Sequence, residues 1–324
     1  MKVTQTLEAV DRVLESEQDS GNRNHLGASI IGGKCARKIW YSFYWAKQAT
    51  FKGRILRLFE RGHLEEERFI GYLEKIGCEV WQHGADGHNQ IRFKDVDGHF
   101  GGSLDGICVG IPELPENAPC LLEFKTHGDN SFKTLEKQGV YNSKFEHFVQ
   151  MQIYMQKMDL QYGLYMAVNK NTDAWHTELI ELDRELAKQY TDRARKIIYS
   201  DEAPLRISNE ASFYVCRFCD FTEICHKQEI PNINCRTCAH STPVKEGQWN
   251  CARDWAIGNE VQIEKGCSDH VYNPHMINRV EIIGGNAEEN YLELKTNSGH
   301  VFKHGPGHVT SKQIKDDGIP NEPA

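Results

Sequence analysis

The hexapeptide Leu-Leu-Glu-Phe-Lys-Thr constrains the fold more than any other part of this chain. In an extended strand alternate side chains point to opposite faces, so Glu123 and Lys125 share one face. Leu122 and Phe124 share the other face and require an apolar core beneath them. Asp105, in the preceding Gly-Gly-Ser-Leu-Asp-Gly segment, is expected to join the polar face. We therefore expect a sheet-based fold in which two carboxylates and an amine share one patch.

Carboxylates buried close together repel each other, and a divalent cation held by oxygen ligands is the usual resolution. An amine beside them can orient or deprotonate a water bound to that cation. The combination predicts a hydrolytic site for a phosphodiester, with the metal acting as Lewis acid, generator of the nucleophile and template. Mg²⁺ or Mn²⁺ is the cation expected for such a set of oxygen ligands.

Two segments with helical patterning flank this strand in the sequence. Residues 54–76 carry apolar side chains at helical spacing and include His63. Downstream, Gln150 and Tyr154 lie one turn apart in a helix expected at about 145–158. Each residue also has a structural explanation, since His63 can be a surface histidine and Gln150 with Tyr154 the edge of an amphipathic helix.

A helix with His, a strand with Asp, a strand with Glu-x-Lys and a helix with Gln-x-x-x-Tyr resemble, in that order, the motifs of the RecB-like branch of the PD-(D/E)xK nuclease superfamily. The resemblance covers roughly residues 28–226. It implies an α/β fold with a restriction-endonuclease-like core, in which a central mixed sheet is flanked by helices. It also implies phosphodiester hydrolysis in DNA.

The resemblance further assigns roles to individual residues. The ligands that it implies for Mg²⁺ or Mn²⁺ are His63, Asp105, Glu123 and the carbonyl oxygen of Phe124. Lys125 would activate the attacking water. The remaining polar residues, which would position Lys125 or a substrate phosphate or join the site through a water, are Gln150, Tyr154, Glu66 and Glu67.

Eleven cysteines are many for a chain with no recognisable signal peptide and no apolar run long enough to span a bilayer. A cytoplasmic, reducing location and metal ligation are therefore expected in place of disulfides. Cys216, Cys219 and Cys225 form C-x2-C-x5-C and lack a fourth thiol, which Cys35 is expected to supply. Four thiolates suit zinc and iron–sulfur equally well.

The arrangement of one cysteine before the core and three after it resembles the iron–sulfur members of the RecB-like family, such as the CRISPR-adaptation exonucleases and the AddB nuclease domain. This resemblance implies a [4Fe–4S] cluster that pins the N-terminal helix to the end of the domain. Its role would be structural, because metal–thiolate bonds can offset the entropy of closing so long a loop. Zinc remains the alternative for this site.

A third group of cysteines follows and predicts a compact zinc-ribbon-like module. Its thiols are Cys235, Cys238, Cys251 and Cys267, with His240 or His270 as competing ligands for Zn²⁺. Cys267 can instead be a free cysteine, because its spacing is loose. The other three cysteines fall in apolar patterns and are expected in the core: Cys78, Cys108 and Cys120.

A formal net charge of −8 gives no overall basic signal of the kind expected for a high-affinity duplex binder, so contact with DNA is expected to be local. The basic residues expected to make it are Lys34, Arg37, Lys38, Arg57 and Arg61. Aromatic residues that either stack on bases or pack inward lie beside them: Trp40, Tyr41, Phe43, Tyr44 and Trp45.

Length and patterning suggest three parts: a RecB-like domain over 1–230, a zinc module over 231–275, and a short β extension with a polar tail over 276–324. The tail from Ser311 is expected to be disordered and 127–144 to be a mobile loop beside the site. The stretch 99–110 is expected to form a single strand.

These observations favour a metal-dependent DNA exonuclease, acting on single-stranded ends, of a bacteriophage or mobile-element type. Its expected partners are DNA and, in such a setting, recombination or replication proteins, with no membrane partner. The alternatives are an endonuclease of the same fold and a non-catalytic nucleic-acid-binding module. An iron–sulfur redox protein is disfavoured, since no nicotinamide or flavin fingerprint is present.

Overall fold

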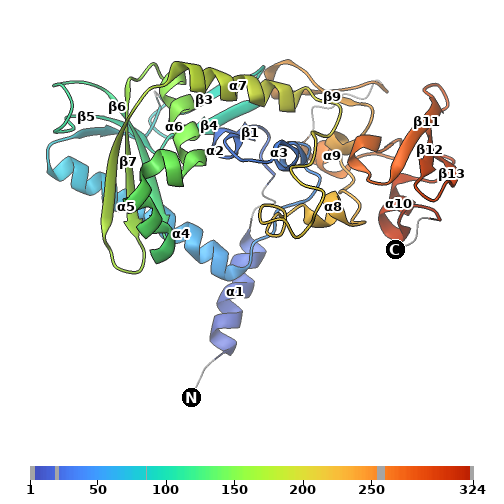
Figure 1. Cartoon of the computed structure of the whole chain (residues 1–324), viewed down its shortest axis with the longest axis horizontal. Helices are drawn as coiled ribbons and strands as arrows, with labels where there is room; N and C mark the ends of the chain where they lie inside the picture. The colour runs from blue at the N-terminus through green and yellow to red at the C-terminus, as the bar shows by residue number, and fades with distance from the viewer. Residues whose placement is uncertain (1–3, 19–21, 85, 254–259, 322–324) are drawn as a thin grey trace.

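The computed structural model of the chain describes residues 4–18, 22–84, 86–253 and 260–321. A five-stranded sheet occupies one end of the molecule and a small three-stranded sheet the other, with short helices and the cysteine-rich segments between them (Figure 1). Among the helices within those ranges, none is both long enough and apolar enough to cross a bilayer.

The large sheet is mixed, as expected for an α/β fold. Its strands, in spatial order, are β2 (Glu79–Trp81), β5 (Gly106–Val109), β6 (Cys120–His127), β7 (Tyr162–Asn169) and β8 (Trp175–Glu181). Only β6 and β7 run parallel, and the remaining neighbours are antiparallel. A parallel pair needs a crossover connection, which helices α5 (Asp129–Ser143) and α6 (Phe145–Lys157) provide.

Strand β6 is buried on both faces. On one face Leu122 and Phe124 pack in a cluster with Phe69 of helix α4 (Gly53–Lys75). On the other face Leu121 belongs to a cluster that includes Met151 of α6. The two-residue alternation of β6 therefore sends Glu123 and Lys125 toward α6, as the sequence predicts.

Helix α1 spans Gln5–Glu17 and helix α7 spans Arg184–Ile198, and Asp183 caps α7 by accepting a hydrogen bond from the Leu186 N–H at 3.0 Å. The segment 99–110, however, is two strands and not one. Strand β4 (Phe100–Ser103) pairs with β1 (Leu26–Gly27) and β3 (Arg92–Asp95) in a separate sheet, whereas β5 joins the large sheet. Leu104, fully buried, and Asp105 form the break between them.

The expectation of a mobile loop over 127–144 is wrong, because residues 129–143 form helix α5. The stretch is polar overall, but Phe132, Leu135 and Val140 are buried on one side of the helix. Gly139 interrupts the helix with φ of +70°, a conformation that glycine adopts without steric cost. Three well-placed apolar residues thus outweigh the polar composition.

Residues 311–321 of the polar tail are also ordered, contrary to expectation. Helix α10 (Ser311–Asp317) begins with a capping box, in which the Thr310 hydroxyl accepts from the Gln313 N–H and the Gln313 side chain accepts from the Thr310 N–H. Ser311 and Ile314 are buried. Ile314 packs in a cluster with Tyr272, Leu294 and other residues of the C-terminal part.

Short elements build the rest of the chain. They are α2 (Ala28–Ile31), α3 (Ala36–Phe43), α8 (Thr222–His226), η1 (Cys235–Thr237), β9 (Ser241–Pro243), η2 (Lys245–Gly247), β10 (Trp249–Cys251), α9 (Glu260–Lys265) and η3 (Pro274–Met276). The expected strands after residue 276 are β11 (Val280–Asn286), β12 (Tyr291–Thr296) and β13 (Val301–His304), an antiparallel meander.

The cysteine-rich segment packs directly against α3. Trp249 lies against the rings of Phe43 and Tyr44, and the buried Arg236 donates to the carbonyl oxygen of Phe43 at 2.9 Å. Five aromatic residues at 40–45 are at most 3% exposed, which confirms inward packing and leaves these rings unavailable for stacking on bases: Trp40, Tyr41, Phe43, Tyr44 and Trp45. The division at residue 230 stays a prediction.

Candidate active site

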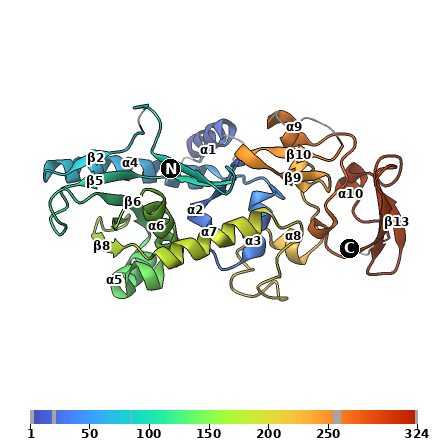
Figure 2. The ribbon, with the colours of Figure 1, turned by 90° about the horizontal axis from the view of Figure 1, so that it is seen from above.

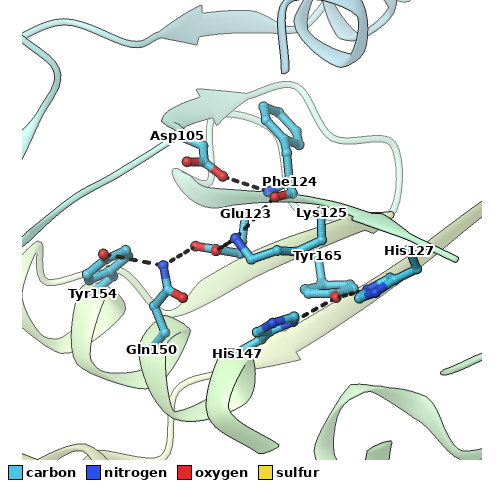
Figure 3. Close-up of polar contacts among 9 residues, drawn as sticks. All are labelled: Asp105, Glu123, Phe124, Lys125, His127, His147, Gln150, Tyr154 and Tyr165. Atoms are coloured by element: carbon cyan, nitrogen blue, oxygen red, sulfur yellow. Dashed lines mark hydrogen bonds and ion pairs between the residues drawn. The ribbon is translucent and has the colours of Figure 1, made fainter. Parts of the chain in front are cut away.

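Strand β6 and helix α6 face each other and present polar side chains to one another (Figure 3). Glu123 and Lys125 alternate along β6 and point to the same side. Gln150 and Tyr154 project toward them from α6, one turn apart. We call Asp105, Glu123, Lys125, Gln150 and Tyr154 the carboxylate site.

Glu123 is the centre of this site and is 0% exposed. Lys125 forms an ion pair with its Oε1, and the same Nζ donates to the carbonyl oxygen of Phe124 at 3.1 Å. Gln150 Nε2 donates to Glu123 Oε2 at 3.2 Å and also contacts the Tyr154 hydroxyl at 3.3 Å. Gln150 therefore positions Glu123, whereas the sequence predicted Lys125 or a phosphate as its partner.

Asp105 reaches the same place from the break between β4 and β5. Its Oδ2 accepts a hydrogen bond from the Phe124 N–H at 2.7 Å, which fixes the carboxylate beside β6. Gly102 leaves room for Tyr154, because a Cβ at position 102 would lie 2.5 Å from the tyrosine hydroxyl oxygen. Gly102 thus allows α6 to approach β4.

The electrostatics of the site follow from burial and from the crowding of carboxylates. Burial raises the pKa of Glu123 to about 7, and the charges of Asp105 and Glu66 add to the effect. Burial likewise raises the pKa of Glu66 to about 6, with Asp105 contributing. Burial lowers the pKa of Lys125, but Glu123 and Asp105 more than offset this, and the net shift is upward. Excess negative charge at this place favours a bound cation.

The two α4 residues considered for this site differ in position. His63 is exposed, and within the described residues it makes no hydrogen bond or ion pair with Asp105 or Glu123. Glu66, one turn further along α4, interacts electrostatically with Asp105, Lys125 and Glu123. The structure therefore brings Glu66 closer to the chemistry than His63, and ligation by His63 stays a prediction.

Three residues beside the carboxylate site were missed in the sequence. His127 continues the alternation of Glu123 and Lys125 along β6, and His147 lies one turn before Gln150 on α6. Both rings contact the hydroxyl of the buried Tyr165 on β7 (Figure 3). The periods of 2 and 3.6 would have found both histidines, because they fall on the same faces as the residues already chosen.

The donor set of the carboxylate site suits a hard cation. Asp105, Glu123 and the Phe124 carbonyl offer oxygens only, the ligand type that Mg²⁺ and Mn²⁺ prefer. Within the described residues, no group of three or more His, Cys, Asp or Glu side chains is gathered tightly enough to hold a metal ion. In the present arrangement Lys125 is the positive partner of Glu123.

Four thiols line one cavity, which we call the first thiol cavity: Cys35 from the N-terminal part of the chain, and Cys216, Cys219 and Cys225, which follow the large sheet in the sequence. Burial raises the pKa values of the Cys216, Cys219 and Cys225 thiols. Arg37 and Arg206 line the same cavity, and each buries a guanidinium Nε that has no hydrogen-bond partner among the described residues. Two guanidinium groups beside thiols suit a negatively charged ligand set.

The second thiol cavity is lined by Cys235, Cys238, Cys251 and Cys267 together with His240 and His270. Both histidines already have other partners. His240 Nε2 contacts Asn290 Oδ1 at 2.6 Å, while the two ring nitrogens of His270 contact Ser311 Oγ at 2.7 Å and the Asn234 carbonyl oxygen at 3.1 Å. His270 therefore uses both ring nitrogens in contacts with protein groups, whereas the contact of His240 with Asn290 involves Nε2 alone.

All eleven cysteines lie within the described residues, and none is disulfide-bonded. Cys78, Cys108 and Cys120 are at most 5% exposed and pack in the cluster beneath α4. This confirms that they are core residues.

Most of the basic residues proposed for DNA contact have protein partners. Lys34 donates to the Tyr214 hydroxyl at 3.0 Å, and Lys38 pairs with Asp220 at 3.8 Å. Arg57 forms an ion pair with Asp11 that ties α4 to α1, and Arg61 donates to the Lys170 carbonyl oxygen at 3.0 Å. Their roles in binding DNA stay predictions.

No family model matches the sequence, and no curated protein matches it. Among solved structures, the chain is similar to SSO0001, with 16% identity and a TM-score of 0.40, over 69% of this chain and 98% of that one. It is also similar to LHK-Exo in complex with dAMP, with 17% identity and a TM-score of 0.37, over 59% and 90%. A further similar structure is the alkaline exonuclease LHK-Exo from Laribacter hongkongensis, with 16% identity and a TM-score of 0.39, over 57% and 90%. These similarities are too weak to carry an argument about activity.

Proposed function

We propose that this chain is a divalent-metal-dependent deoxyribonuclease that removes nucleotides from single-stranded DNA ends. The observation that carries the proposal is that Asp105 and Lys125 both contact the backbone of Phe124, while Lys125 also pairs with the buried Glu123. Two carboxylates, a carbonyl and an amine at one place are the groups that metal-assisted phosphodiester hydrolysis requires. The order of motifs in the sequence supports the same function.

Asp105, Glu123 and the Phe124 carbonyl would hold Mg²⁺ or Mn²⁺, with Glu66 close enough to assist. When bound, the cation would polarise the phosphodiester and acidify a water. Lys125 would orient the attacking water and accept its proton at Nζ, because a second positive charge beside Glu123 lowers the pKa of the amine. Gln150 would keep Glu123 oriented, since its amide donates to the Oε2 that Lys125 does not contact.

The thiols of the first cavity would hold a structural [4Fe–4S] cluster, with zinc as the alternative, and those of the second cavity would hold Zn²⁺. The lining by four thiols in each case supports these assignments. A setting in bacteriophage-type replication, recombination or host-DNA degradation belongs to the proposal and rests on resemblance alone.

One gel assay tests the activity and its mode. Labelled circular single strands, linear single strands of equal length and linear duplexes would be incubated with Mg²⁺, Mn²⁺ or EDTA. We expect metal-dependent loss of the linear single strand, slower loss of the duplex and an intact circle. Loss of the circle at the rate of the linear strand would favour an endonuclease, and no cleavage with either metal would overturn the proposal.

A further inference from the structure

A chain of hydrogen bonds runs beside the carboxylate site and is not used by the proposed function. Ser131 Oγ lies 3.3 Å from His127 Nδ1, His127 Nε2 lies 2.9 Å from the Tyr165 hydroxyl, and that hydroxyl lies 3.0 Å from His147 Nδ1. The two imidazole rings stack with their centroids 5.9 Å apart (Figure 3). The chain therefore links β6, β7, α5 and α6.

The hydroxyl of Tyr165 sets the relation between the two histidines. It carries one hydrogen, so it can donate to only one of the two rings and accepts from the other when that ring is protonated on the facing nitrogen. Tyr165 is 0% exposed, and water does not compete for these contacts. In one direction of the chain, Ser131 donates to His127, His127 donates to Tyr165, and Tyr165 donates to His147. The Nδ1 of His147 is then an acceptor, so its Nε2 carries the hydrogen and points out of the chain.

The surroundings keep both rings neutral and yet favour an anion. Burial lowers the pKa of His147 to about 3, and Lys125, His127 and Lys144 lower it further. Burial also lowers the pKa of His127 to about 4, with Lys144 and Lys125 contributing. A neutral N–H donor surrounded by lysines suits a phosphate oxygen better than a cation or another donor.

His147 differs from His127 in having a nitrogen that remains available. His127 uses both ring nitrogens within the chain, whereas His147 Nε2 has no hydrogen-bond partner among the residues that the structure describes. His147 is also partly exposed, while His127 is buried. His147 and Gln150 project from α6 toward the face of β6 that carries Glu123 and Lys125 (Figure 3).

We propose that His147 Nε2–H binds a phosphate of the DNA backbone next to the scissile one, and that Tyr165 and His127 act as positioning residues that fix its tautomer. The inference rests on the proposed function, which supplies the substrate. It adds a substrate-binding residue to the carboxylate site and explains why a tyrosine hydroxyl is held between two imidazoles in the sheet.

Two substitutions separate substrate binding from a purely structural role. In His147→Gln the side-chain amide reaches near the position of Nε2, whereas in His147→Asn it reaches near Nδ1 and can contact only Tyr165. We expect His147→Asn to raise KM for a single strand about tenfold with kcat little changed, and His147→Gln to restore most of the affinity. The opposite order, with Asn tolerated and Gln defective, would show that holding Tyr165 is the role of His147 and would overturn the inference.

Neutral methylphosphonate linkages identify the phosphate that is bound. Binding of single strands carrying one such linkage would be measured in EDTA, where metal-dependent cleavage is absent. We expect one position at which the wild type loses about tenfold in affinity and His147→Asn loses nothing further. His176→Asn on β8, whose ring contacts Glu178, serves as the control and should behave as wild type at every position.

The outcomes distinguish this inference from the proposed function. One outcome is that the wild type cleaves DNA while no methylphosphonate position gives a loss of affinity that is absent in His147→Asn. In that case the inference fails and the nuclease assignment stands. If the coupling is present in EDTA but neither Mg²⁺ nor Mn²⁺ supports cleavage, the phosphate contact stands and the nuclease assignment fails.

Discussion

The carboxylate site and the first thiol cavity are built in different ways. The carboxylate site takes its residues from one stretch, 105–154, and Glu123, Asp105 and Lys125 each have a protein partner already. The first thiol cavity joins Cys35 to thiols that follow the whole large sheet in the sequence, and burial raises the pKa values of three of its thiols. Figure 2 shows α3, which Cys35 directly precedes, and α8, which carries Cys225, to one side of the β6 and α6 region.

This difference predicts that the carboxylate site serves the chemistry and the first thiol cavity serves the stability of the fold. The fold alone holds the carboxylate site together, so the loss of one of its side chains should affect chemistry more than folding. The thiols of the first thiol cavity do not stabilise one another without a bound ligand. A bound metal would link them and close a long loop of the chain. Substitutions of these thiols should lower the stability of the fold more than they lower the rate of cleavage.

The largest expected effect is on cleavage. Asp105→Asn keeps the acceptor for the Phe124 N–H but loses the negative charge, and Lys125→Met keeps the volume but loses the amine. We expect each to reduce the cleavage rate by about a thousandfold or more, because each removes stabilisation of the transition state. Rates on labelled linear single strands and thermal unfolding would be measured together.

Asp192→Asn, at an exposed position of α7, is the matched control and should leave both rate and stability unchanged. Cleavage by Asp105→Asn or Lys125→Met at the wild-type rate would show that the chemistry lies elsewhere. If substitutions in the carboxylate site lowered the stability of the fold as much as substitutions in the first thiol cavity, the proposed difference between the two regions would be wrong.

The second effect is on metal content and stability. Anaerobically purified protein should be brown and contain iron, acid-labile sulfide and zinc. Cys216→Ala should lose the colour and lower the free energy of unfolding by about 3 kcal/mol or more, the order of a lost cross-link over a long loop. Cys238→Ala should lose zinc and keep the colour, and Cys78→Ala, in the core, should keep both metals.

Metal analysis, absorption spectra and denaturant titrations measure these changes. Anaerobic protein that is colourless and contains zinc alone would reject the iron–sulfur assignment. Retention of iron in Cys216→Ala would remove this residue from the ligand set.

The smallest effect is on the pH dependence of cleavage. The pKa of Glu123 is raised to about 7 and that of Glu66 to about 6, so these carboxyls become protonated as pH falls through this range. A protonated carboxyl does not bind a cation, and cleavage at limiting Mg²⁺ should fall about tenfold between pH 7.5 and 6. Higher Mg²⁺ should shift the fall to lower pH, because binding competes with protonation.

Rates between pH 5.5 and 8.5 at two Mg²⁺ concentrations test this prediction, with iron content followed in the same samples. Iron content should not change over the range in which cleavage falls, because the thiol ligands are distant from these carboxyls in the fold. A rate that is independent of pH at low Mg²⁺ would contradict the electrostatic description of the carboxylate site.

The sequence predicted those elements whose hydrophobic period is clear. Strand β6 and helices α4 and α6 follow periods of 2 and 3.6 and lie where expected. Helices α5 and α10 were missed because their composition is polar, and they are stabilised by a few buried residues and by a capping box. The break at Asp105 was missed because strand pairing, and not local pattern, decides which sheet each half joins.

For the candidate site, the sequence by itself determined which chemical groups are available and how neighbours along one element are arranged. Glu123 and Lys125 must lie on one face of a strand, and Gln150 and Tyr154 must lie one turn apart on one side of a helix. Only the tertiary structure decided that Gln150 contacts Glu123, that Glu66 lies nearer than His63, and that Tyr165 joins two histidines beside the site. Such side-chain contacts depend on the positions and rotations of α6 and α4 on the two faces of β6. That geometry is set by the packing of the whole core, which no local spacing encodes.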